Sequence, residues 1–156
     1  MNFTDNKGQS WEVVVSVGTA KACRTLLDID ICDLPTDFDL VQRLRVDDVL
    51  LANVLYVCCK EQAESRGVSD EAFGGLLVGD VIEQAEAALW EALTFFFRGV
   101  RREQLVKAIQ IQKDLEAGAL AELTPERQAG LIRKVKQAAG KTIDEILKEA
   151  SYTNDA

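Results

Sequence analysis

The sequence predicts a mainly α-helical protein of the α+β class, in which an N-terminal β-hairpin is followed by a bundle of five to seven helices. Apolar residues make up 47% of the 156 residues, and through most of the chain they recur at helical spacing. The first stretch has the alternation and the turn residues that are typical of paired strands, whereas the alternating segment Asp28–Pro35 could be a short extended piece or a connecting loop. A chain of this length can bury a core of its own, and its length favours a single domain.

The hairpin is expected over residues 2–17. Asp5-Asn6-Lys7-Gly8 has turn composition, because Asn and Gly tolerate a positive φ. Beyond the turn, the alternating apolar residues would share one face: Trp11, Val13, Val15 and Val17. An isolated hairpin is marginal in water, so this face should pack on helices or on the sheet of another chain.

Helical patterns follow from Thr19, which can cap the first helix. The expected helices run from Ala20 to Leu27, from Asp37 to Leu44, from Asp48 to about Arg66, from Asp70 over a short stretch, and from Gly79 to about Arg98. The third is capped by Asp47 and is apolar on most sides up to Cys59, which is typical of a helix at the centre of a core. Ser69 should cap the fourth.

The charge balance changes near Gly99. Residues 1–97 hold 7 basic and 17 acidic residues, whereas residues 98–156 hold 11 and 9. We therefore expect an acidic core domain over residues 1–98 and a helical extension over residues 99–156. The extension should hold one helix from Arg101 to Ala117 that ends near Gly118, and a second that begins at Thr124 with Pro125 in its first position.

The residues needed for catalysis or metal binding are scarce. Histidine is absent, which removes the most common general base and metal ligand, and the four cysteines form no CxxC pair. Asp28, Asp30 and Asp33 resemble a calcium ladder, but the sixth position of such a loop would be Asp33 in place of Gly, so a solvated acidic loop is favoured. We expect no enzyme activity, no catalytic residues, no cofactor and no metal site.

The net charge of −8 argues against nucleic acid and anionic membranes as partners, since their phosphates would repel most of the surface. The N-terminus lacks a secretory pattern, and the longest apolar stretches are about ten residues, too short to span a bilayer. A cytosolic protein with reduced, buried cysteines is the simplest interpretation.

Two features are candidates for contact with a partner. The run Phe95-Phe96-Phe97 spans about 200° of helical arc, so one core cannot easily bury all three rings. Either two rings are core and one packs beneath the next helix, or the run is a hydrophobic anchor. The basic C-terminal helix could bind nucleic acid or an acidic partner, although a solvated face is favoured. The candidate partner-binding residues are Trp90, Phe95, Phe96, Phe97, Leu131, Val135, Ile143 and Ile146.

Several segments follow one another in a familiar order over residues 11–97. They are the strand Trp11–Val17, then Thr19-Ala20-Lys21-Ala22-Cys23-Arg24, Leu26-Leu27-Asp28-Ile29-Asp30, Asp47-Asp48-Val49-Leu50-Leu51-Ala52-Asn53-Val54-Leu55-Tyr56, Gln62-Ala63-Glu64-Ser65-Arg66-Gly67-Val68-Ser69-Asp70-Glu71-Ala72-Phe73, Gly79-Asp80-Val81-Ile82 and Phe95-Phe96-Phe97. This order resembles the tail assembly chaperones of long-tailed bacteriophages and prophages.

The resemblance implies a non-enzymatic protein that binds the tape measure protein, keeps it soluble and helps to recruit tail tube subunits. Its expected location is the host cytoplasm, and it is not expected in the mature virion. The chain could also associate with itself. The alternative is a structural protein that stays in the virion, such as a head–tail connector or a tail-completion subunit. A regulatory module that binds nucleic acid through its C-terminal helix is a third hypothesis.

Overall fold

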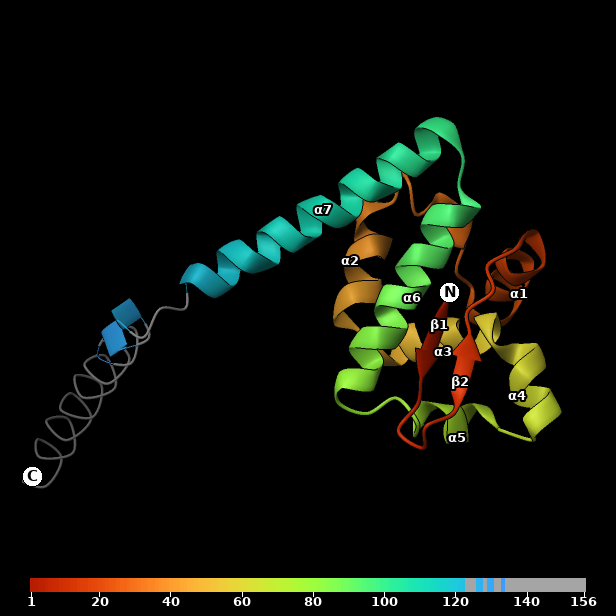
Figure 1. The fold of residues 1–156 in the computed structure, drawn as a ribbon. Coiled ribbons are helices and arrows are strands. Elements are labelled where there is room, and N and C mark those ends of the chain that lie inside the picture. Colours follow the sequence, from red (N-terminus) through yellow and green to blue (C-terminus); the bar gives the residue numbers. More distant parts are fainter. Residues whose placement is uncertain (123–125, 128, 131–132, 134–156) are drawn as a thin grey trace, which may run out of the picture. The chain divides into compact units, whose positions relative to one another are not determined.

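A computed structural model of the chain describes residues 1–122, 126–127, 129–130 and 133. This part of the chain has a two-stranded hairpin followed by seven α-helices, which confirms the predicted fold class (Figure 1). The elements are β1 (Asn2–Thr4), β2 (Ser10–Glu12), α1 (Val17–Leu27), the 3-10 helix η1 (Ile31–Asp33), α2 (Phe38–Val46), α3 (Asp48–Cys58), α4 (Lys60–Arg66), α5 (Asp70–Gly74), α6 (Asp80–Phe96) and α7 (Gly99–Glu122). No helix in the described ranges is long and apolar enough to cross a membrane.

Two compact units divide the chain, Met1–Gln112 and Lys113–Ala156. The predicted domain boundary after residue 98 stays a prediction. The first compact unit ends later in the chain, at Gln112 within α7. The core described below belongs to this first unit.

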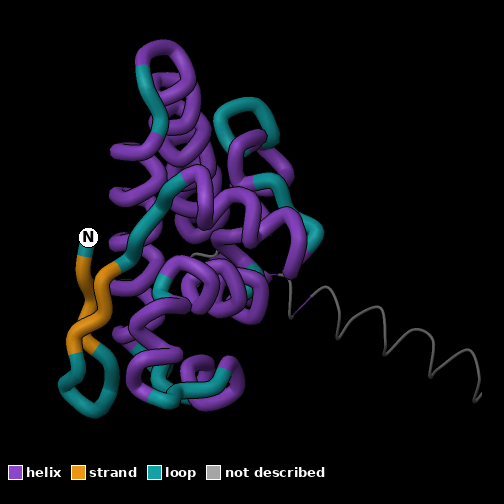
Figure 2. The backbone as a smooth tube through the Cα atoms, turned by 90° about the vertical axis from the view of Figure 1, so that its right-hand side faces the viewer, coloured by secondary structure: helices purple, strands orange, loops and turns teal. Residues whose placement is uncertain are grey.

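The hairpin pairs its two short strands in antiparallel register, with Phe3 opposite Trp11. Both rings are buried, and β1 lies against α6, so the hairpin packs on helices of its own chain (Figure 2). The connecting turn closes as expected, with Gly8 at a φ of 79° and its N–H donating to the Asp5 carbonyl over 3.0 Å. The turn residues therefore predicted this connection correctly.

The hairpin is shorter than predicted, because β2 ends at Glu12. Val13 is buried and Val15 partly buried, but Val17 is 63% exposed and begins α1. The expected capping residue was wrong. Ser16 caps α1 by accepting the Thr19 N–H over 3.1 Å, while the Thr19 hydroxyl accepts the Ser16 N–H. This reciprocal pair starts the helix three residues before the expected Ala20.

Helix α3 lies at the centre of the core, as its composition predicted. It contacts α1, α2, α5 and α6, and its buried residues are Leu51, Val54, Leu55, Val57 and Cys58. Asp47 caps it by accepting the N–H groups of Val49 and Leu50, which confirms the expected start.

The predicted single helix from Asp48 to Arg66 is wrong, because the chain breaks at Cys59 into α3 and α4. Glu12 of β2 lies beside this break. The Gln62 side chain accepts the Glu12 N–H over 3.0 Å and donates to its carbonyl over 2.6 Å, as a neighbouring strand would. The sequence at Cys59 has no glycine or proline, so this contact with β2 is the feature that accompanies the break.

The remaining helix boundaries shift by small amounts. Ser69 caps α5 as expected, and α6 ends at Phe96 instead of Arg98. Helix α7 begins at Gly99 and runs through Gly118 to Glu122, because a glycine inside a helix costs only about 1 kcal/mol. The apolar stripe of the second expected C-terminal helix lies outside the described residues.

An aromatic cluster joins the hairpin to the helices. The Phe73 ring makes edge-on contacts with Trp11 at 5.0 Å, Tyr56 at 5.6 Å and Phe3 at 6.4 Å between ring centroids. Phe73 is 1% exposed. This one side chain therefore connects α5, α3 and both strands.

Truncation of Phe73 to alanine should lower the free energy of unfolding by about 3–5 kcal/mol, because it removes the ring shared by these elements and leaves a cavity. Urea unfolding followed by circular dichroism measures the change. Phe95→Ala is the matched control: this ring is 75% exposed, so the change should stay within about 0.5 kcal/mol. A similar loss in both variants would contradict the packing described for Phe73.

The Asp5 carboxylate holds the turn and the strand together. It accepts the N–H groups of Lys7 and Gln9 over 2.8 and 2.9 Å, and the Trp11 indole N–H over 2.8 Å. Burial raises the pKa of Asp5, but these three hydrogen bonds and the nearby Lys7 charge outweigh it, so the pKa lies below its ordinary value of 3.8. The carboxylate therefore stabilises the fold above pH 3.8, and this contribution is lost as the pH falls through the folded-state pKa.

Replacement of Asp5 by asparagine should lower the free energy of unfolding at pH 7 by about 1–2 kcal/mol, because charge-assisted hydrogen bonds are lost. The difference from wild type should narrow as the pH falls below 3.8, because Asp5 takes up a proton there in the unfolded chain and, owing to its lower pKa, only at a lower pH in the folded protein. Urea unfolding at a series of pH values measures it. A difference that is unchanged down to about pH 2.5 would show that the charge plays no part.

Candidate partner-binding site

The structure separates the candidate aromatic residues by burial. Trp90 is 7% exposed and donates its indole N–H to Glu86 over 2.9 Å, and Phe97 is 3% exposed. Phe96 is half-buried and packs on the core, while Phe95 is 75% exposed. Trp90 and Phe97 are therefore core residues in this structure, and the surface consists of Phe95 with part of Phe96. The other four candidates, Leu131, Val135, Ile143 and Ile146, lie outside the described residues.

The chain turns between α6 and α7, and this corner determines where the rings of Phe95, Phe96 and Phe97 lie. Phe97 leaves the helix in an extended conformation, with φ −76° and ψ 154°, and Gly99 turns the chain with a φ of 53°. The Arg102 guanidinium then donates to the carbonyl groups that end α6. Its Nε lies 2.9 Å from both the Thr94 and Phe97 oxygens, and one terminal nitrogen lies 3.3 Å from the Phe95 oxygen. A cation at a helix C-terminus is favourable because the carbonyls there lack partners.

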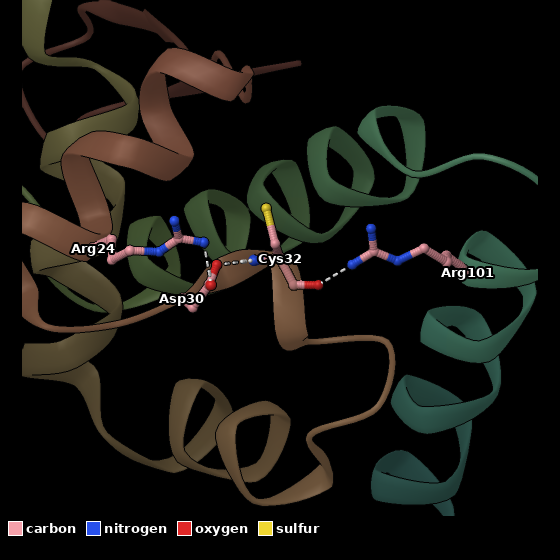
Figure 3. A network of polar contacts seen from close by, with 4 residues as sticks. All are labelled: Arg24, Asp30, Cys32 and Arg101. Carbon is pink, nitrogen blue, oxygen red and sulfur yellow. Dashed lines mark hydrogen bonds and ion pairs between the residues drawn. The ribbon is translucent and has the colours of Figure 1, made fainter.

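Arg101 connects the start of α7 to η1, which is distant from it in sequence. Its guanidinium lies 5.0 Å from the centre of the Phe97 ring and donates to the Cys32 carbonyl of η1 (Figure 3). The neighbouring Asp30 accepts the Cys32 N–H over 3.0 Å and forms an ion pair with Arg24. These contacts connect α1, η1 and the first turn of α7.

The acidic loop is therefore held by hydrogen bonds. Burial raises the pKa of Asp30, but the Arg24 guanidinium and the Cys32 N–H lower it by more, so the pKa lies below its ordinary value. Among the described residues, no three Cys, Asp or Glu side chains are grouped so that they could hold a metal ion.

The cysteines give no reactive thiolate in this part of the chain. Cys23, Cys58 and Cys59 are buried, as expected, and Cys32 is half-buried. Burial raises the pKa of Cys23 to about 11 and that of Cys59 to about 12. Such thiols are almost wholly protonated at neutral pH and are poor nucleophiles.

Helix α7 leaves much of its apolar surface exposed. In the first unit it buries Leu105, Ala108 and Gln112, and Ile109 partly. Its other large apolar side chains are about half exposed or more: Val100 (68%), Val106 (48%) and Ile111 (50%), and, in the second unit, Leu115 (58%) and Leu120 (73%).

Within the first unit, Val100, Val106 and Ile111 are therefore exposed apolar side chains in addition to Phe95 of the aromatic run. The exposure of Val100 and Ile111 could not be predicted, because the sequence pattern does not distinguish an exposed valine or isoleucine on a helix from a buried one. Phe95 was found because three aromatics in a row cannot share one face of a helix.

Comparison of the chain with family models, curated proteins and solved structures finds no match.

Replacement of Arg102 by alanine should lower the free energy of unfolding by about 1–2 kcal/mol, because three carbonyl groups at the end of α6 lose a charged donor. It should also speed proteolytic cleavage near Gly99. Urea unfolding and limited trypsin or chymotrypsin digestion measure the two effects. Arg98→Ala is the matched control, since Arg98 has no hydrogen bond or ion pair with any described residue. Equal destabilisation by both variants would contradict the capping role.

Proposed function

We propose that this protein is a tail assembly chaperone of a long-tailed bacteriophage or prophage. In this role it binds the tape measure protein, keeps it soluble during assembly and helps to recruit tail tube subunits. The role is non-enzymatic. The order of signals over residues 11–97 supports it, as does a surface suited to a second polypeptide.

The observation that carries the proposal is the exposed apolar surface of α6 and α7. Within the first unit, Phe95, Val100 and Ile111 have half or more of their surface in water. A folded domain gains about 25 cal/mol for each Å² of apolar surface that it buries, so exposed aromatic and aliphatic groups of this size favour a partner. An amphipathic helix of a long, partly apolar chain such as the tape measure protein would cover them.

The charge of the chain supports the same role. The net charge of −8 helps to keep a complex with an apolar partner dissolved. Such a protein acts before the tail is complete, so we propose that it works in the host cytoplasm and is absent from the finished virion. Self-association remains part of the proposal and would be seen as a concentration-dependent mass.

Co-expression with the tape measure protein of the same genome tests the proposal. We expect the soluble, copurifying tape measure protein to increase when this chain is present. The variant Phe95→Asp/Ile111→Asp should lower the copurifying amount by about tenfold, since charges replace the exposed apolar contacts.

The control is Val17→Asp/Leu26→Asp, which places two charges at side chains on α1 that are 63% and 56% exposed. It should copurify as wild type does. A tape measure protein that is equally insoluble with and without this chain would contradict the proposal. Stoichiometric amounts of this chain in purified virions would favour the head–tail connector or tail-completion role in its place.

A further inference from the structure

A groove lies on a second part of the first unit, where the start of α3 faces α5 and the start of α6. Its volume is about 400 Å³. Val49, Ala52, Leu77 and Ile82 form its apolar part, and Asn53 and Gly74 complete it with three acidic residues, Asp48, Asp70 and Glu71. No lysine or arginine is among these described lining residues.

The three carboxylates have no partner in the described part of the chain. Asp48, Asp70 and Glu71 are exposed, and none of their side-chain carboxylates forms a hydrogen bond or ion pair with another described residue. Each also lies in the first turn of its helix, where a negative charge is favourable. This interaction with the helix start explains why acidic residues occur at these positions. It does not explain the apolar side chains that line the same groove.

The apolar part of the groove is open to water at Val49, which is 70% exposed although it belongs to the most apolar helix of the core. Apolar side chains beside unpaired carboxylates complement one kind of surface: an apolar stripe flanked by lysine or arginine.

We propose that this groove binds a basic amphipathic helix of a partner protein. The apolar stripe of that helix packs on Val49, Leu77 and Ile82, and its lysine or arginine side chains pair with Asp48, Asp70 and Glu71. This is the helix-in-groove mode of recognition, with the acids setting specificity by charge. The groove is a different surface from Phe95 and α7, so this inference goes beyond the proposed chaperone role and can fail independently of it.

The test uses the full chain and two labelled peptides of about 18 residues, each with a leucine stripe on one helical face. One peptide carries lysine beside the stripe, and the other carries glutamate at the same positions. Fluorescence anisotropy should show binding of the lysine peptide and not of the glutamate peptide. Val49→Lys should weaken binding of the lysine peptide by about tenfold, and Glu71→Gln should weaken it by about threefold.

Val17→Lys is the matched control, because Val17 is 63% exposed and also lies in the first turn of a helix, α1. It introduces the same charge away from the groove and should change the affinity by less than about twofold. Unfolding midpoints check that each variant folds. Equal weakening by Val49→Lys and Val17→Lys would show attraction to the acidic chain as a whole and would overturn the proposal. So would equal binding of the two peptides, or no binding of either.

Discussion

Helix α3 has apolar side chains on nearly all of its sides, and the first unit is built around the need to keep them from water. Each large aliphatic side chain gains about 1.5–3 kcal/mol on full burial, and Leu51, Val54 and Leu55 are almost completely buried. One neighbouring helix could cover only part of such a surface. Helices α1, α2, α5 and α6 therefore all contact α3, and Phe73 of α5 attaches the hairpin to the same core.

This arrangement limits what the remaining apolar residues can do. Helix α6 directs Leu89 and Leu93 into the core, and Phe97 follows at the corner. Phe95, on the same helix, must then point elsewhere, because consecutive helical residues are about 100° apart. The exposed apolar side chains of α6 and α7 are in this sense a consequence of how the core is filled, and they are the observation on which the proposed partner rests.

The two proposed surfaces differ in chemistry. The surface at Phe95 and Ile111 is apolar and lies beside Arg101 and Arg102, whose guanidinium groups are used within the chain to hold the corner. The groove at Val49 has carboxylates with no partner among the described residues. An apolar surface favours affinity, whereas a charged rim favours the choice of partner and its orientation.

The sequence by itself determined the fold class, the turn at Gly8, the caps at Asp47 and Ser69, and the central place of α3, because periodicity, turn residues and caps are local properties. It also identified Phe95 as an unusual residue, but not Val49 or Ile111. The start of α1 at Val17 is also local, because Ser16 and Thr19 cap the helix reciprocally. Only the tertiary structure decided that Trp90 and Phe97 are buried and that the helix after Asp48 breaks at Cys59. These outcomes go with contacts between residues far apart in the chain, such as Gln62 with Glu12 and Arg101 with Cys32, and no local pattern encodes them.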